Sequence, residues 1–263
     1  MEDRLCLWIA SRLYGGSRND RHGGAQAVED GGGGRGVKEP RLILLEGNIG
    51  AGKSTLGAEL KQSGLFDFVP EPVDQWRTGF AGNLLAMFYA DPKRWAYTFQ
   101  NVAFTTRAKT WQEILARTQH DNVVLERSIL CDRYVFAQNC YETGLMSDVE
   151  WQVYVGMWDW VMANFHAVPH HILYLRTPVD LCMKRLRERA RGEEVGVSAE
   201  YLGQLEGKHD DWLLKDPRAI VLDGRKWWTA GDIAGVLGVE HGYDSQGRAC
   251  SLEVRPEMCE AAR

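Results

Sequence analysis

The sequence predicts an α/β fold that contains a P-loop and a five-stranded parallel sheet flanked by helices. Short apolar runs alternate with longer amphipathic segments, a glycine-rich loop follows the first run, and charged residues follow the next two. Short buried runs that alternate with helical segments are typical of a parallel sheet covered on both faces. The apolar runs are residues 42–45, 66–69, 123–125, 172–175 and 219–222.

The composition bounds the partners and the compartment. A chain of 263 residues with 44% hydrophobic and 25% charged residues fits one catalytic domain with tails. The net charge of −5 gives no electrostatic reason to expect nucleic acid or an anionic membrane as the main partner. Six cysteines without metal-ligand spacing favour a reducing compartment, which we expect to be the cytoplasm. Mitochondria are the alternative, because the start of the chain carries Arg4, Arg12, Arg18 and Arg21.

Three segments divide the chain. Residues 1–40 contain a glycine-rich polar stretch that cannot offset its ordering entropy, so we expect a disordered leader. Residues 41–230 carry the alternating pattern and form the expected catalytic domain. Residues 231–263 are expected to form a divergent, partly disordered tail that begins with a short helix near residues 232–237.

A phosphate-binding loop follows the first apolar run. Glycines allow backbone N–H groups to converge on phosphate oxygens, Lys53 adds a positive charge, and Ser54 can ligate Mg²⁺. The helix that follows contributes its positive N-terminal end. A glycine-rich turn without a ligand is the alternative, which the flanking strand and helix disfavour. The residues of this expected ATP site are Gly47, Asn48, Ile49, Gly50, Ala51, Gly52, Lys53, Ser54 and Thr55.

Charged residues follow the second and third apolar runs, at the strand ends where ligands bind in open α/β sheets. Glu71 lies between Pro70 and Pro72, and this rigidity suits a positioned base. Glu126 and Arg127 come directly after the third run. A carboxylate beside a guanidinium can hold Mg²⁺ and stabilise a transferring phosphoryl group, although an ion-paired loop is an equal alternative.

Several motifs occur in a fixed order along the chain. They are the P-loop at 47–55, Pro70-Glu71-Pro72-Val73 with Trp76, Arg94-Trp95 through Thr98-Phe99-Gln100, Glu126-Arg127-Ser128 with Asp132-Arg133-Tyr134, and Glu193-Glu194 with Tyr201. This set resembles the deoxyribonucleoside kinases over about residues 41–225. The resemblance is closest to the deoxycytidine and deoxyguanosine kinase branch, and an ordered set is far more specific than a lone P-loop.

The resemblance implies catalytic roles. Glu71 would take the proton from the 5'-hydroxyl of a deoxynucleoside, and Arg127 would steady that oxygen and the phosphoryl group. Glu126 would act with Ser54 in holding Mg²⁺, although it could instead accept the proton. Lys53 completes the catalytic set. The expected reaction is ATP-dependent phosphorylation in nucleotide salvage, where an alcohol must lose its proton as it attacks.

The resemblance also implies a deoxynucleoside site. Gln100 would pair with the base, Tyr89 and Glu194 would hold the 3'-hydroxyl, and aromatic rings would wall the base, although core packing is the better reading of each aromatic taken alone. In thymidine-preferring members apolar or small residues stand where this chain has Arg107 and Asp132. We therefore expect deoxycytidine, deoxyadenosine or deoxyguanosine to be favoured over thymidine. The implied residues are Glu71, Trp76, Tyr89, Gln100, Ala103, Arg107, Asp132, Phe136, Glu194 and Tyr201.

A basic run near residue 185 has two readings. Such a run is usually a solvated helix face, but the resemblance implies an arginine-rich lid that places Arg185, Arg189 and Arg191 at the phosphates of ATP. After the last strand the family usually has an acidic loop at the donor base, whereas this chain has Gly224-Arg225-Lys226-Trp227-Trp228. The donor, ATP or UTP, and the C-terminal helix of the fold are therefore left open.

Oligomeric state and two other functions complete the expectations. An apolar stripe through Trp151, Tyr154 and Trp158 indicates a packing helix, and the resemblance implies that its outer face forms a homodimer. A nucleoside monophosphate kinase is one alternative, but it would need extra cations and has little use for Glu71. A nucleotide-binding protein without turnover is the other, and it has no use for a hydroxyl-activating carboxylate.

Overall fold

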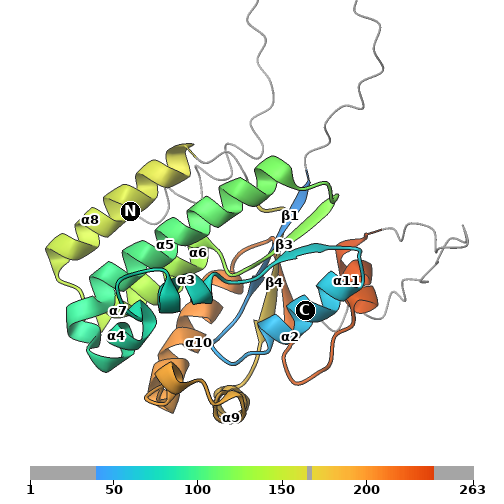
Figure 1. Ribbon diagram of the computed structural model, residues 1–263. Helices are drawn as coiled ribbons and strands as arrows, with labels where there is room; N and C mark the ends of the chain where they lie inside the picture. Colours follow the sequence, from blue (N-terminus) through green and yellow to red (C-terminus); the bar gives the residue numbers. More distant parts are fainter. Residues whose placement is uncertain (1–39, 165–167, 240–263) are drawn as a thin grey trace, which may run out of the picture. The chain divides into compact units, whose positions relative to one another are not determined.

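The computed structural model describes residues 40–164 and 168–239, so the expected leader and most of the expected tail lie outside the described residues. The described residues form one parallel sheet in the order β2-β3-β1-β4-β5 (Figure 1). Its strands are β1 (Arg41–Glu46), β2 (Asp67–Val69), β3 (Asn122–Glu126), β4 (His171–Arg176) and β5 (Ala219–Asp223). Each strand coincides with one of the apolar runs, so the predicted α/β fold class is confirmed.

Helices cover both faces of the sheet. In Figure 1, α2 and α11 lie on one side of the strands, and α5, α8 and α10 lie on the other. The α-helices are α2 (Lys53–Gln62), α3 (Val73–Thr78), α4 (Leu84–Ala90), α5 (Pro92–Arg117), α6 (Ile129–Cys131), α7 (Gln138–Glu142), α8 (Asp148–Asn164), α9 (Val179–Arg189), α10 (Ala199–Leu213) and α11 (Ala230–Leu237). Two further helical segments have a different pitch: the π-helix η1 (Asp132–Ala137) and the 3₁₀-helix η2 (Gly192–Glu194).

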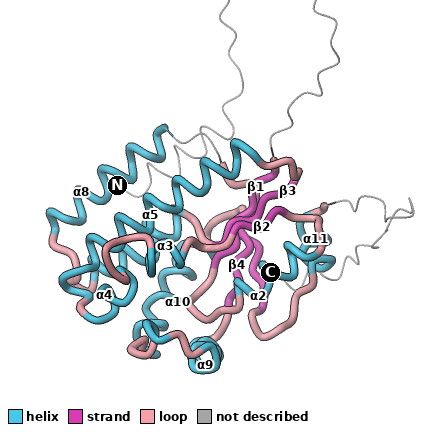
Figure 2. The backbone as a smooth tube through the Cα atoms, viewed as in Figure 1, coloured by secondary structure: helices cyan, strands magenta, loops and turns pink. Residues whose placement is uncertain are grey.

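The central strand β1 positions the site. It pairs with β3 on one side and β4 on the other, and its Leu44 lies opposite both Leu125 and Ile172. A strand buried on both faces needs a continuous apolar run rather than an alternating one, which is what residues 42–45 provide. Figure 2 shows the strands gathered between the helices. Because every neighbouring pair of strands is parallel, the loops after β1, β2 and β3 all leave the sheet at its carboxyl end.

Helix α11 belongs to the hydrophobic core. Ile233, Ala234 and Leu237 are buried in the same cluster as Leu56 and Leu60 of α2. The helix is bounded by a capping box at its start, in which the side chains of Thr229 and Asp232 each bond to the backbone of the other, and by a left-handed glycine at its end. The short helix predicted near residues 232–237 is thus confirmed.

Helix α8 has apolar side chains both on the face that packs into the protein and on the face that points outward. Tyr154 and Trp158 of the predicted stripe are buried, whereas Val153, Met157 and Trp160 are exposed to solvent. Across residues 40–164 and 168–239, no helix combines the length and the apolar character needed to cross a membrane. The outer face of α8 is an exposed apolar surface.

Gly57 offers a test of the packing between α2 and β2. A Cβ atom at this position would lie 2.0 Å from the ring of Phe68, so we expect Gly57→Ala to lower the free energy of unfolding by about 1–3 kcal/mol. Gly203→Ala in α10 is the matched control, because a Cβ atom there meets nothing within 4 Å. That substitution should raise stability by about 1 kcal/mol. Denaturant unfolding measures both changes, and two changes of the same sign would contradict the prediction.

Candidate active site

The loop between β1 and α2 is held against β4 and α9. Gly47 has φ 146° and Gly50 has φ 77°. A Cβ atom at Gly47 would lie 2.6 Å from the Leu175 carbonyl oxygen, and one at Gly50 would lie 2.6 Å from that of Cys182. Only glycine satisfies both the backbone conformation and the close approach at these positions. The helix that follows has no side-chain cap, so its first N–H groups are available to an anion.

Lys53 and Ser54 begin α2 and point in different directions. The Lys53 ammonium group donates to the carbonyl oxygens of Gly47 and Asn48, at 3.1 and 2.9 Å, and so arches over the loop. Burial and the nearby positive charge of Arg127 lower the pKa of Lys53 to about 8. The Ser54 hydroxyl donates to Glu126 at 2.9 Å. The two residues that the sequence predicts as metal ligands therefore lie side by side.

Glu71 follows β2 and lies between two cations. Its Oε1 accepts from Nη2 of Arg107 at 2.6 Å and lies 3.3 Å from Nε of Arg127. Burial acts to raise the pKa of Glu71, but the positive charges of Arg107, Arg127 and Lys53 outweigh it and lower the pKa to about 2. Glu71 is therefore ionised throughout the neutral range, at a point where β2 and β3 both end.

Arg107 of α5 joins Glu71 to Asp132. Its Nε lies 3.0 and 2.9 Å from the two carboxylate oxygens of Asp132. Burial raises the pKa of Asp132 to about 6, against the opposing effect of Arg107. The guanidinium also lies over the ring of Trp76, 4.9 Å from its centroid. Its Nη1 is buried without a hydrogen-bond partner, so the two N–H groups of this nitrogen remain for a further acceptor.

Gln100 of α5 is a second buried group with unused hydrogen-bonding capacity. Its Nε2 lies 3.7 Å from the sulfur of Cys140, whereas its Oε1 is buried without a partner. Phe88 and Phe99 stack with their centroids 4.8 Å apart, and Trp76 packs edge-on against Phe99 at 5.4 Å. An amide thus lies beside an aromatic wall, an arrangement suited to a flat heterocycle.

The arginines near the end of α9 have different partners. Arg185 donates to the carbonyl oxygens of Ala51 and Gly224, which holds α9 against the phosphate loop. Arg189 and Arg191 both pair with Glu194 instead. The predicted lid residues and the predicted 3'-hydroxyl ligand Glu194 are therefore in contact with one another.

One cavity of about 920 Å³ collects nearly all of the predicted site residues. From the phosphate loop it is lined by Ile49, Gly50, Ala51, Gly52, Lys53, Ser54 and Thr55. From the remaining elements it is lined by Glu71, Trp76, Tyr89, Gln100, Ala103, Arg107, Glu126, Arg127, Asp132, Phe136, Arg185, Arg189, Arg191, Glu194 and Tyr201. The phosphate loop and several aromatic side chains therefore face the same space.

Two predicted residues lie outside this lining, and several residues absent from the predicted site are part of it. Gly47 forms the turn behind the loop, and the Asn48 side chain donates to the Leu202 carbonyl oxygen at 2.9 Å, so it links the loop to α10. The additional lining residues include Phe88, Phe99, Lys226, Trp227 and Trp228. Phe99 could have been found in the sequence, because it adjoins Gln100 in a motif, and Lys226, Trp227 and Trp228 stand where the family has its donor-base loop.

This arrangement defines a P-loop phosphotransferase, in which the phosphate loop shares a cavity with a buried carboxylate and two arginines. The deoxynucleoside kinase family model matches residues 43–230. A probable deoxycytidine kinase of Fowlpox virus (strain NVSL) is 44% identical over 173 residues, 66% of this chain and 72% of the viral protein. Deoxycytidine kinase 2 of Gallus gallus is 37% identical over 213 residues, 72% and 80% of the two chains. Human thymidine kinase 2, mitochondrial, is 35% identical over 175 residues, 66% and 64%.

The chain belongs to the deoxynucleoside kinase family. It is an enzyme that phosphorylates deoxynucleosides in nucleotide salvage, with a nucleotide as the phosphate donor. The predicted family and class of enzyme are thereby confirmed, whereas the roles of the individual residues remain predictions.

Proposed function

We propose that Glu71 accepts the proton of the deoxynucleoside 5'-hydroxyl and that Arg127 stabilises the transferring phosphoryl group. The observation that carries this proposal is the position of Glu71, held by two arginines in the cavity that the phosphate loop also lines. Its pKa of about 2 makes it a weak base. A weak base suffices where the alcohol becomes acidic only as its oxygen bonds to phosphorus, because positioning and charge then provide most of the catalysis.

Mg²⁺ is the proposed metal cofactor, and ATP is the proposed phosphate donor. The Ser54 hydroxyl and the Glu126 carboxylate offer adjacent oxygen donors, which are the ligands that Mg²⁺ prefers, so the residues fit the ion. Bound Mg²⁺ would neutralise charge on the donor phosphates. Arg185, Arg189 and Arg191 are proposed to contact those phosphates. UTP stays an alternative donor, because Lys226, Trp227 and Trp228 face the cavity where the family has an acidic loop.

We propose that the base lies against the aromatic wall and is read by Gln100 together with Asp132. Cytosine presents an exocyclic amine donor, and Gln100 Oε1 and the Asp132 carboxylate are both acceptors. Thymine presents O4, an acceptor that would face the Asp132 carboxylate without a proton between them. The deoxycytidine kinases among the relatives support the same choice. Deoxycytidine is therefore the proposed substrate, with deoxyadenosine and deoxyguanosine as alternatives.

The outer face of α8 is proposed to form a homodimer. Val149 is 71% exposed and Trp160 is 68% exposed, and Val153 and Met157 lie between them at helical spacing. A contiguous apolar stripe of this kind is typical of a protein interface.

Three cysteines in the described part of the chain, Cys131, Cys140 and Cys182, are free thiols, which supports a reducing compartment: the cytoplasm, with the mitochondrial matrix as the alternative.

The catalytic assignment is tested with Glu71→Gln and Glu126→Gln. We expect Glu71→Gln to lower kcat by about 10²- to 10⁴-fold, because an amide cannot accept the proton, while the Mg²⁺ concentration that gives half-maximal rate stays unchanged. Glu126→Gln should instead raise that Mg²⁺ requirement. Initial rates of ADP formation at varied Mg²⁺ measure both effects. If only Glu126→Gln abolishes turnover at saturating Mg²⁺, Glu126 rather than Glu71 is the base.

The base preference is tested with the isosteric change Asp132→Asn. We expect kcat/KM of the wild type to be higher for deoxycytidine than for thymidine, and the ratio to fall by about 10- to 100-fold in the variant, because an amide can donate to O4. Steady-state rates with all four deoxynucleosides provide the measurement. Thymidine as the best substrate of the wild type would contradict the proposal.

The dimer is tested by sedimentation velocity at micromolar concentration. The wild type should sediment as a dimer, and the double variant Val153→Glu, Trp160→Glu as a monomer, because two buried carboxylates per subunit would face an apolar surface. Leu214→Glu, at another exposed apolar position, is the matched control and should remain dimeric. A monomeric wild type would exclude the interface.

A further inference from the structure

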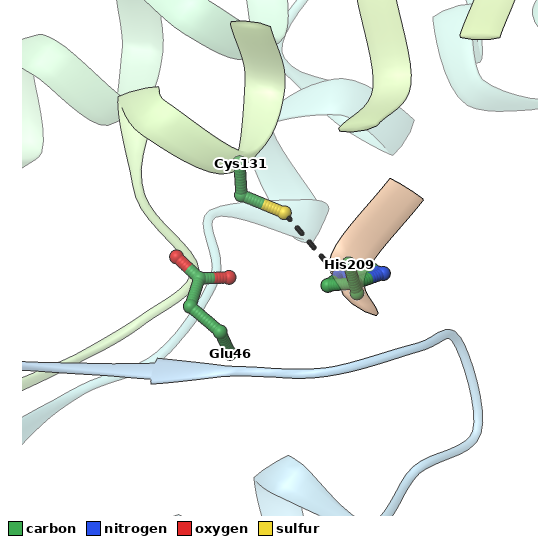
Figure 3. A group of neighbouring side chains, drawn as sticks. All are labelled: Glu46, Cys131 and His209. Atoms are coloured by element: carbon green, nitrogen blue, oxygen red, sulfur yellow. Dashed lines mark hydrogen bonds between the residues drawn. The ribbon is translucent and has the colours of Figure 1, made fainter. Parts of the chain in front are cut away.

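Three chemically active side chains lie beneath Arg127, outside the cavity lining. Glu46 ends β1, Cys131 ends α6 and His209 lies in α10, and all three are buried. One donor atom from each lies within 4.8 Å of the other two. Figure 3 shows the three side chains converging, with a hydrogen bond between the sulfur of Cys131 and the His209 ring. No role in the phosphoryl transfer described above uses them.

Glu46 supports the backbone of the turn that carries Arg127. Arg127 has φ 64°, a left-handed conformation that costs a non-glycine residue about 1–3 kcal/mol. The turn is held by two bonds to β1: the Arg127 N–H donates to the Leu45 carbonyl oxygen at 3.0 Å, and the Ser128 hydroxyl donates to Glu46 at 2.6 Å. The strained conformation aims the Arg127 side chain at Glu71.

Cys131 and His209 support the guanidinium itself. The His209 Nδ1 lies 2.7 Å from the Leu205 carbonyl oxygen, which has no proton to give, so Nδ1 carries the hydrogen. Burial lowers the pKa of His209 to about 3, so the ring is neutral and its Nε2 is an acceptor. Nε2 lies 3.7 Å from the sulfur of Cys131, whose thiol pKa is raised by burial, so the S–H group donates to it. The sulfur in turn accepts from Arg127 Nη1 at 3.6 Å.

The hydrogen bonds therefore run in one direction, from Arg127 to the Cys131 thiol, to His209 and to the backbone of α10. A reversed relay is impossible, because a guanidinium has no lone pair to accept with. The ring of Phe136, 4.7 Å from the guanidinium carbon, adds a contact on one face. The head group of Arg127 is thus fixed by a protonated thiol as well as by Glu71.

The same three residues resemble a metal site in their donors, since a thiolate, an imidazole and a carboxylate all bind Zn²⁺. The surroundings oppose this reading. Arg127 already donates to the sulfur, and its positive charge would repel a divalent cation bound to the same atom. The site is also fully buried, with every ligand inside the core.

We propose that Cys131 and His209 are positioning residues that hold the Arg127 guanidinium in its reactive orientation from the side opposite the substrate. The inference rests on the proposed catalytic role of Arg127. It predicts that the support acts on the transition state, because a slightly misplaced guanidinium still leaves the binding contacts of both substrates in place.

The test compares Cys131→Ala with Cys131→Ser. A hydroxyl, like a thiol, can accept from Arg127 and donate to His209, whereas a methyl group can do neither. We expect Cys131→Ala to lower kcat by about 10- to 100-fold, with KM for deoxycytidine and ATP changed by less than about twofold. Cys131→Ser should keep kcat within about threefold of the wild type. Denaturant unfolding of both variants identifies any loss that comes from stability alone.

A double-mutant cycle separates this inference from the proposed role of Arg127. In the Arg127→Ala background, Cys131→Ala should cause no further loss in single-turnover rate, because the group that it supports is gone. If Arg127→Ala keeps the wild-type rate, the catalytic role of Arg127 fails. The positioning role fails if Arg127→Ala is slow but Cys131→Ala matches the wild-type rate. It also fails if the loss of rate in the double variant equals the product of the losses in the two single variants. The positioning role would also be overturned if the wild type bound one equivalent of zinc and Cys131→Ala bound none.

Discussion

The buried charge network around Arg107 is the interaction on which the rest of the site depends. Arg107 donates to Glu71 and to both oxygens of Asp132, and Arg127 approaches Glu71 from the other side. Taking each ion out of water costs several kcal/mol, so such a network persists only while every charge keeps its partners. The four groups come from the ends of β2 and β3, from α5 and from η1. Their mutual dependence therefore fixes these elements relative to one another around the cavity.

This network divides the cavity into two electrostatic environments. Around Arg107, two arginines are compensated by two carboxylates, an environment that offers hydrogen-bonding groups rather than net charge and suits a neutral heterocycle. Near the phosphate loop, Lys53, Arg185 and the uncapped start of α2 act in the same direction and favour anions. A chain with a net charge of −5 can thus bind a polyphosphate, because the positive charge is concentrated locally.

A second layer lies behind the charged one, and Cys131 and His209 are its neutral members. A protonated thiol and a neutral imidazole extend the hydrogen bonds of Arg127 into α10 without adding charge to a site that is already balanced. The π-helix η1 contributes to the cavity above this layer. Asp132 and Phe136 line the cavity, whereas Val135 is fully buried. The wider turn of a π-helix, common at functional sites, accommodates this arrangement within six residues.

The sequence by itself determined the features that depend on neighbouring residues: five strands from apolar runs, the phosphate loop from its glycines, and the short helix near residue 232. Most of the site residues were predicted through ordered motifs rather than through their individual chemistry, which fits packing equally well. Only the tertiary structure decided the strand order and the bridging role of Arg107. The same holds for the hydrogen bond from the Asn48 side chain to α10 and for the pairing of Arg189 with Glu194. These features join residues that are distant in the chain or have several competing partners. Burial and distance select among such partners, and neither is defined before the chain has folded.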